Sequence, residues 1–189
     1  MSSAPNNSIK FGNMATADQL ASLLPLEFEP AKIVGNKGLR VYPLKTPLSM
    51  KLSDVCDCDI PFPPGVFNGR GHEERVNICF TISDEWLDVM RRIEADCCKI
   101  VGESTWASSI KDNEGYKPLI KCKLQLVGEK AVKYYDIDGV STSPPPSWNR
   151  VSCNAVIQIR GMYSAGTSTG LQLDCTHVQY DTKQELSPF

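Results

Sequence analysis

The distribution of prolines in the first third of this chain excludes a long helix there. Seven prolines lie between Leu20 and Pro64: Pro25, Pro30, Pro43, Pro47, Pro61, Pro63 and Pro64. Because proline lacks a backbone N–H and fixes φ, each one breaks a helix and interrupts a strand ladder. We therefore expect a Pro-rich N-terminal extension with short strands at 32–35 and 39–43, joined by a turn at 36–38.

One main helix is predicted at about 83–99. Ser83 stands where an N-cap belongs, and Asp84 and Glu85 suit the positive end of a helix dipole. Apolar residues then recur at helical spacing as far as Cys97, with charged residues between them. This pattern is typical of an amphipathic helix that packs one face on a core.

Alternating apolar residues predict several strands. The runs lie at 75–82, 116–128, 131–137, 151–160 and 171–180. We expect 131–137 to be the hairpin partner of 116–128, and Gly161 to end the strand at 151–160. Together the runs indicate a β-rich α+β fold, as a small closed barrel or a sandwich. The predicted organisation is a flexible arm at 1–19, one domain at 20–180 and a tail at 181–189.

The overall charge argues against one class of nucleic-acid binder. The 189 residues include 20 Lys and Arg against 22 Asp and Glu, a net charge of −2, which excludes a polycation that coats nucleic acid by bulk charge. A local basic groove stays compatible with this balance. No apolar run is long enough for a membrane span, and residues 1–7 lack the pattern of a signal peptide. We therefore expect an intracellular protein without membrane contact.

Cysteine is abundant, with eight residues against two histidines. We expect a reducing compartment, cysteines that act as small core hydrophobes, and no disulfide framework. A Cys3His metal site could be assembled from Cys56, Cys58, His72 and Cys79, but these spacings fit no common zinc pattern. We expect no metal or cofactor, and whether these four residues bind a metal stays open.

Motifs typical of enzymes are missing from the chain. It has no phosphate-binding glycine loop, no zinc-protease helix motif and no nucleophile elbow. Asp136 and Asp138 precede a glycine in a turn, where aspartate is expected without catalysis. For His72 and His177 we expect a structural or exposed role. We therefore expect a protein that is not an enzyme and has no catalytic residues.

Basic and aromatic residues are interleaved on the predicted strands. Between Lys117 and Tyr135 there are five lysines and one glutamate. Cations can follow phosphates while flat side chains stack on bases, as single-strand binders require. The candidate nucleic-acid contacts are Trp106, Tyr116, Lys117, Lys121, Lys123, Lys133, Tyr134, Trp148, Arg150 and Arg160. The alternative is a solvated strand face whose aromatic residues turn into the core.

An ordered series of short motifs resembles a known family. The series is Thr46-Pro-Leu, Pro61-Phe-Pro-Pro-Gly-Val, Val76–Ser83 before the Trp86 helix, Trp106, Tyr116-Lys-Pro-Leu-Ile-Lys-Cys-Lys-Leu, Gly170-Leu-Gln-Leu and Val178-Gln. Its order resembles the single-stranded-DNA-binding proteins of large nucleo-cytoplasmic DNA viruses, which are likened to the replicative single-strand binders of podophages. The resemblance covers roughly residues 40–180. It implies an OB-fold-like five-stranded antiparallel barrel with one helix, which binds single-stranded DNA across one face.

The same resemblance implies a role for the C-terminal tail. Family members end in an acidic tail with a terminal aromatic residue, which takes part in dimer contacts and recruits replication proteins. Glu185, Pro188 and Phe189 match this tail by position. Here the tail is short and weakly acidic, a departure that bears on the recruiting role. A viral origin would place the protein in the host nucleus or a cytoplasmic viral factory.

The leading hypothesis is sequence-tolerant binding of single-stranded DNA in replication or recombination. The partners would be single-stranded DNA, replication proteins through the tail, and a second copy in a homodimer. The alternative is a structural virion protein of β-sandwich type that self-assembles and clasps a neighbour with its Pro-rich segment. A third hypothesis is an enzyme with an unrecognised site.

Overall fold

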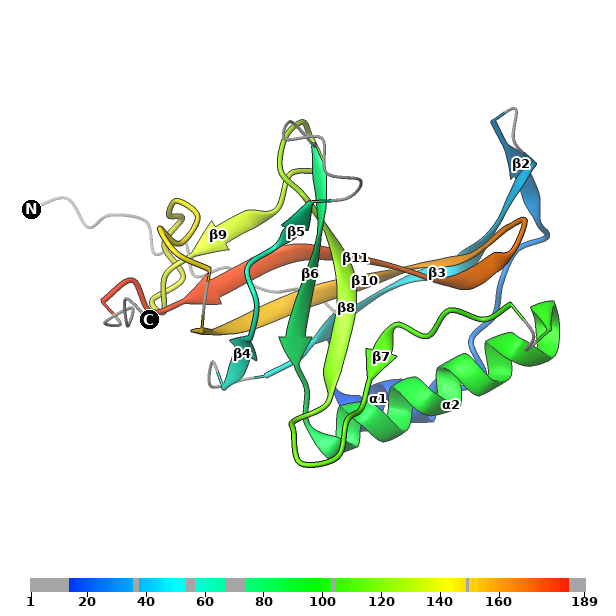
Figure 1. The fold of residues 1–189 in the computed structure, drawn as a ribbon, viewed down its shortest axis with the longest axis horizontal. Coiled ribbons are helices and arrows are strands. Elements are labelled where there is room, and N and C mark those ends of the chain that lie inside the picture. Colours follow the sequence, from blue (N-terminus) through cyan, green and yellow to red (C-terminus); the bar gives the residue numbers. More distant parts are fainter. Residues whose placement is uncertain are drawn as a thin grey trace, which may run out of the picture.

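A computed structural model describes residues 14–35, 38–53, 57–66, 74–102, 105–148 and 150–183, which form one curled β-sheet with two helices (Figure 1). The helices are α1 (Ala17–Ser22) and α2 (Asp84–Val101). The strands are β1 (Met14–Ala15), β2 (Lys32–Val34), β3 (Leu39–Lys51), β4 (Cys58–Ile60), β5 (Gly65–Val66), β6 (Arg75–Thr81), β7 (Ile110–Lys111), β8 (Leu119–Gln125), β9 (Lys133–Tyr135), β10 (Val151–Ala165) and β11 (Ser168–Tyr180).

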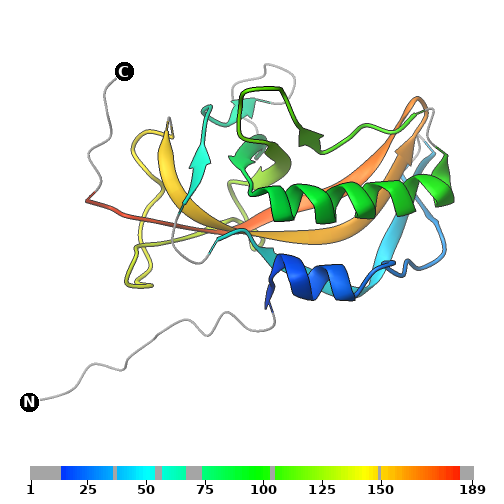
Figure 2. The same ribbon diagram turned by 90° about the horizontal axis from the view of Figure 1, so that it is seen from below.

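The sheet is built around the long β10–β11 hairpin. Its main order is β1-β3-β10-β11-β8-β6-β5. β6 and β8 cross the layer of β3, β10 and β11 steeply, so the sheet curls into a half-barrel (Figure 1). α2 lies across this curl with α1 beside it (Figure 2). The buried core lies between the helices and the inner face of the strands.

The main helix follows the sequence prediction closely. Its N-cap is Ser83, whose Oγ accepts a hydrogen bond from the backbone N–H of Trp86 at 3.3 Å. The buried Trp86 indole donates to the carbonyl oxygen of Leu52 at 3.1 Å, which joins the first turn to the end of β3. The helix predicted at about 83–99 is therefore confirmed, ending two residues later than expected.

The sheet differs from the five-stranded antiparallel barrel that the sequence resemblance implies. The described residues form eleven strands in one open, curled sheet, and β11 pairs in parallel with both β8 and β9. Several of the added strands have only two or three residues, too short to produce a hydrophobic pattern in the sequence. The half-barrel with its helix across the curl is consistent with an OB-like fold.

The segment at 131–137 contains β9, but the predicted hairpin partner is wrong. β8 is already paired with β6 along the whole of one edge, and with β7 and β11 at different positions along the other edge. β9 instead continues along β11 where β8 ends, with Lys133 opposite His177 and Tyr135 opposite Gln179. The edges available in the folded sheet decided this pairing.

Gly161 does not end its strand as expected. β10 continues through it to Ala165, with a register shift between Ile159 and Gly161 that leaves Arg160 unpaired in a β-bulge. Gly161 has φ 150°, and a Cβ there would collide with the carbonyl oxygen of Tyr42 on β3. Glycine is required for this close approach of two strands.

The N-terminal part is more regular than the sequence suggests. β1 and the start of α1 lie inside the expected arm at 1–19, and Thr16 and Gln19 form a capping box. β2 and β3 form the predicted hairpin. β3 runs through Pro43 and Pro47, although its ladder with β10 is interrupted there. The division into arm, domain and tail stays a prediction.

Five of the described cysteines are buried in the core, as predicted: Cys58, Cys97, Cys122, Cys153 and Cys175. Among the described residues no group of His, Cys, Asp and Glu could hold a metal ion. Cys56 and His72 of the candidate metal site lie outside those residues, as do Glu185, Pro188 and Phe189 of the tail. No helix in the described parts is long and apolar enough to cross a membrane.

Candidate nucleic-acid interface

The alternation of β8 directs two lysines away from the core. Ile120, Cys122 and Leu124 are buried, whereas Lys121 and Lys123 between them are exposed. A strand presents successive side chains to opposite faces, so the sequence pattern alone determines this separation. The outward face of β8 continues onto β6, β11 and β10, which lie beside it in the sheet.

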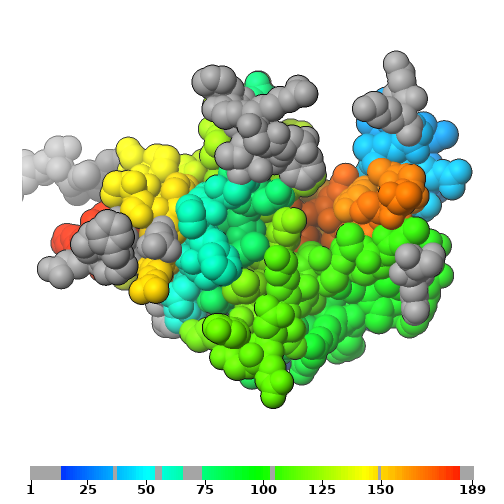
Figure 3. All heavy atoms as spheres, viewed as in Figure 1, coloured from blue at the N-terminus to red at the C-terminus, as the bar shows by residue number. Residues whose placement is uncertain are grey.

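Two neighbouring hollows border these strands, and the smaller one is also lined by the core-side residues Leu171 and Leu173. The larger has a volume of about 680 Å³ and the smaller about 350 Å³. Neighbouring residues on one strand line different hollows: Arg75 and Asn77 on β6, and Asp174 and Leu173 on β11. We call the two together the cationic groove. Figure 3 shows the tip of the β10–β11 hairpin (orange) between the β2–β3 segment (blue) and the green segment that contains α2.

The charge of the groove is opposite to that of the whole chain. Its charged residues are Arg75, Lys121, Lys123, Lys130, Lys133 and Arg160 against Glu129 and Asp174, a net charge of +4. The chain as a whole carries −2. A larger hollow of about 890 Å³ near the start of α2 has charged residues Lys51, Lys117, Asp57, Asp84 and Glu85, a net charge of −1. The electrostatic potential of the groove therefore favours an anionic strand more than that of the hollow near the start of α2 does.

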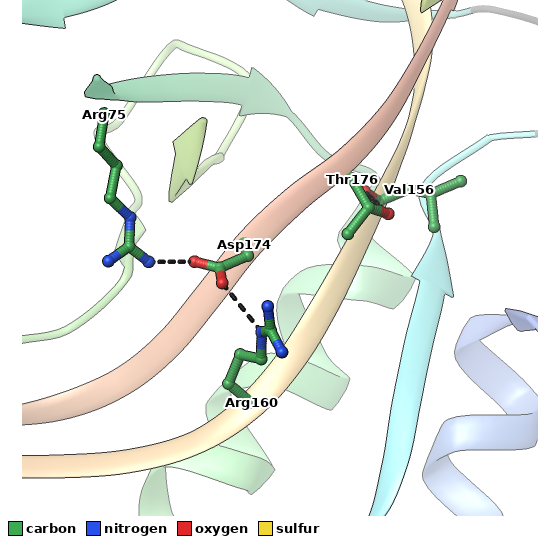
Figure 4. A network of polar contacts seen from close by, with 5 residues as sticks. All are labelled: Arg75, Val156, Arg160, Asp174 and Thr176. Carbon is green, nitrogen blue, oxygen red and sulfur yellow. Dashed lines mark hydrogen bonds and ion pairs between the residues drawn. The ribbon is translucent and has the colours of Figure 1, made fainter. Parts of the chain in front are cut away.

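The centre of the groove is a network of two arginines and one carboxylate (Figure 4). Asp174 on β11 accepts a hydrogen bond at Oδ1 from Nη2 of Arg75 at 2.5 Å, and at Oδ2 from Nε of Arg160 at 3.0 Å. Burial, reinforced by the positive charges of Arg75 and Lys121 and opposed by Asp174, lowers the pKa of Lys123. Burial is the larger cause of this lowered pKa, and the repulsion from Arg75 and Lys121 adds to it.

An aromatic ring borders the smaller hollow. Tyr163 on β10 lies opposite Gly170 on β11, and a Cβ at Gly170 would come within 3.2 Å of both Cε1 and Oη of the ring. The ring therefore lies directly over the glycine, and its hydroxyl is 3.4 Å from Oγ of Ser168. This packing holds a half-exposed ring in one orientation at the edge of the groove.

A buried carboxylate fixes the other border of the smaller hollow. Glu94 on α2 accepts hydrogen bonds from the backbone N–H of Ser109 at 2.8 Å and from the hydroxyls of Ser108 and Ser109 at 2.7 Å. These three bonds satisfy a carboxylate that is only 8% exposed and attach the segment before β7 to the helix. Glu94 is thus a structural residue of the groove wall.

A pair of stacked rings lies at the β9 end of the groove. Tyr135 and His177 stack with ring centroids 5.8 Å apart at 17°. Nδ1 of His177 lies 2.9 Å from the hydroxyl of Thr176, and that hydroxyl donates to the carbonyl oxygen of Val156. Burial, and next the charge of Lys133, lower the pKa of His177 below 6.5. The imidazole is therefore held neutral at pH 7.

Four of the predicted contact residues meet in the groove: Lys121, Lys123, Lys133 and Arg160. Tyr116 and Lys117 instead line the hollow near the start of α2. The ring of Tyr116 is 80% exposed, and the ammonium of Lys117 lies 3.9 Å from Asp59. These six predicted residues thus lie in two separate hollows.

The remaining predicted residues pack or lie elsewhere. Tyr134 and Trp148 form an edge-to-face pair with centroids 5.8 Å apart and pack against the core, where burial raises the pKa of Tyr134. Trp106 is also packed on the core, and its buried Nε1 is without a hydrogen-bond partner among the described residues. Arg150, with φ 57°, donates its backbone N–H to the carbonyl oxygen of Ile60 on β4.

Sequence reasoning missed several groove residues. Arg75 starts a strand 42 positions before Lys117 and lies in no local basic cluster. Tyr135 ends the basic and aromatic stretch and Tyr163 follows it, but neither was among the predicted contacts. Tyr163 carried one usable signal, since an aromatic residue near a glycine-bearing hairpin often covers a glycine on the partner strand.

Comparison with known proteins identifies the fold only. No family model and no curated protein matches the chain. Among solved structures it is similar to the C-terminally truncated single-stranded DNA-binding protein of bacteriophage Enc34, at 14% identity and a TM-score of 0.52, covering 86% of this chain and 98% of that one. It also matches gp2.5, a single-stranded DNA-binding protein of bacteriophage T7, at 12% identity and a TM-score of 0.48, over 76% and 90% of the two chains.

Proposed function

We propose that this protein binds single-stranded DNA along the cationic groove, with little sequence preference and without catalysis. The observation that carries the proposal is a net charge of +4 along one groove of a chain whose total is −2. The fold shared with a phage single-stranded DNA-binding protein supports it. The proposal extends the sequence resemblance to the binders of large nucleo-cytoplasmic DNA viruses.

The cations of the groove contact the phosphates in this proposal. Lys121 and Lys123 contact phosphates at the smaller hollow. Arg75 and Arg160 contact them at the centre of the groove, and Lys133 does so at the β9 end. They come from four strands, so a strand of DNA that contacts them all crosses the sheet. Each phosphate contact with a single strand contributes about 0.7 to the slope of log K against log salt.

Aromatic contacts favour a single strand over a duplex. Tyr163 borders one hollow, and the stacked Tyr135 and His177 lie at the other end of the groove. Base faces are accessible to such rings in a single strand and are covered by neighbouring pairs in a duplex. Trp106, Tyr134 and Trp148 pack against the core, so they are not the stacking residues we favour. Tyr116 and Lys117 would extend the contact surface beyond the groove.

Further parts of the proposal are supported by the sequence resemblance. We propose a role in replication or recombination, inside the cell, with Glu185, Pro188 and Phe189 of the tail contacting replication proteins. A homodimer belongs to the same proposal. Pull-down of replication proteins with the full chain and with a chain ending at residue 183 tests the tail, and sedimentation tests the dimer.

The central test is fluorescence anisotropy of labelled oligo-dT over a series of salt concentrations. We expect binding at low salt that weakens as salt rises. The double variant Lys121→Gln, Lys123→Gln should lower the salt slope by about 1.4, two contacts at about 0.7 each. The matched control is Lys45→Gln, Lys99→Gln. It removes one lysine of β3, which pairs with Glu27, and one of α2, which pairs with Asp96.

Two results would overturn the proposal. One is absence of binding to oligo-dT at low salt, and the other is binding whose strength does not depend on salt. Equal effects of the two double variants would show that net charge, and not the groove, attracts the DNA. Assembly into large particles without nucleic acid, seen by light scattering, would favour the structural virion alternative.

A further inference from the structure

Asp174 is a carboxylate in the middle of a groove that we expect to bind phosphates. Its side chain is 20% exposed, and both of its oxygens accept hydrogen bonds from arginines. Arg75 comes from β6 and Arg160 from β10, on opposite sides of β11 (Figure 4). A surface adapted only to bind an anion would not have a negative charge at this position.

The geometry of this carboxylate resembles that of a bound phosphate. A phosphate, like a carboxylate, offers adjacent oxygens to guanidinium donors, and arginine binds both groups in the same way. A guanidinium has five N–H donors, and the bonds to Asp174 use one from each arginine. The two arginines are therefore already held together around an anion, with donors left for a second one.

We propose that Asp174 is a built-in competitor for the DNA backbone. The inference rests on the proposed function. The carboxylate holds Arg75 and Arg160 where a phosphate binds them, and an arriving phosphate replaces it at one or both guanidinium groups. The carboxylate also repels the phosphate, so it keeps the bound strand easy to release. Asp174 thus sets the affinity and the salt dependence of the groove.

A purely structural role for Asp174 leads to a different expectation. β11 and β8 pair in parallel through two residue pairs, Asp174 with Lys123 and Cys175 with Leu124. The hydrogen bond from Arg75 on β6 to Asp174 on β11 crosses this pairing of β8 with β11. If Asp174 only stabilised the pairing of β8 with β11, its loss would lower the melting temperature and would not strengthen DNA binding. Affinity and salt slope therefore distinguish the two roles.

The test is Asp174→Asn in the full chain, measured by anisotropy with oligo-dT. We expect binding about threefold to tenfold tighter at low salt, because one repulsive charge is removed from the contact site. The salt slope should rise by about 0.7 to 1.4, for one or two additional phosphate contacts. The matched control is Asp112→Asn, which removes the carboxylate partner of Arg91 on α2 and changes the net charge equally.

A second measurement on the unchanged protein covers the case in which the variant does not fold. The Nε–H signal of Arg160 in proton–nitrogen spectra should shift when oligo-dT saturates the protein, while that of Arg91 should stay in place. An unshifted Arg160 signal, or Asp174→Asn binding that is equal or weaker, would overturn the inference. Failure of the unchanged protein to bind oligo-dT would instead overturn the proposed function.

Discussion

Replacing Tyr163 by alanine should weaken DNA binding without changing its dependence on salt. The ring is half-exposed and lies over Gly170, so we expect one of its faces to be available for a base. Loss of an aromatic platform costs about 1–3 kcal/mol per stacked base. With one face available we expect the lower half of this range, about 1 to 2 kcal/mol, an affinity about five- to thirtyfold weaker at 25 °C.

The matched control is Tyr163→Phe, which keeps the ring and removes the hydroxyl. That hydroxyl lies 3.4 Å from Oγ of Ser168, which is long for a hydrogen bond between hydroxyls. We therefore expect an affinity within about twofold of the unchanged protein. Both variants are compared by anisotropy with oligo-dT at several salt concentrations, and their melting temperatures are measured alongside.

The outcomes separate stacking from electrostatics. Because the ring carries no charge, Tyr163→Ala should have the salt slope of the unchanged protein, in contrast to the lysine variants. An unchanged affinity in Tyr163→Ala would refute the placement of a base on this ring. An equally weakened affinity in Tyr163→Phe would show that the hydroxyl, and not stacking, binds the DNA.

Three further predictions concern the frame that holds the groove. Gly161→Ala forces a Cβ against the carbonyl oxygen of Tyr42. It should lower the free energy of unfolding, measured in urea, by about 2–3 kcal/mol or more. An unchanged free energy of unfolding would mean that the bulge relaxes at little cost. Ser83→Ala removes the N-cap of α2 and should cost about 1 kcal/mol, or about 2–4 °C in melting temperature, with no effect on DNA affinity beyond that of unfolding. Because burial lowers the pKa of His177, the unfolded state binds the proton more tightly, so stability should fall as the pH drops below about 6.5 through the lowered value. His177→Asn should flatten this fall, and an identical pH profile would contradict the assignment.

The sequence pattern was sufficient for the local parts of the fold. The helix at Asp84–Val101 was predictable because its N-cap, its first-turn acids and its apolar spacing all indicate the same element. The outward direction of Lys121 and Lys123 was predictable for a similar reason, since period-two alternation is a property of one strand.

The placement of His177 shows where a pattern in one strand fails. Strict alternation from Leu171 would put His177 on the buried side with Cys175. The register shifts at Thr176, which has no opposite residue in β10, so the residues after it change sides. Val178 is then buried, and His177 comes to the groove side. The bulge depends on the partner strand, so one strand alone does not reveal it.

The sequence by itself determined which side chains turn away from the core along an unbroken run such as β8, because that depends on local periodicity and on the burial of apolar groups. Only the tertiary structure decided which of those side chains meet. β9 lies along β11 because no edge of β8 was left, and Arg75 reaches Asp174 because β6 and β11 flank the same strand. Strand order and bulges are set by pairing between distant segments. The same long-range pairing brings six cations together in a chain whose net charge is −2.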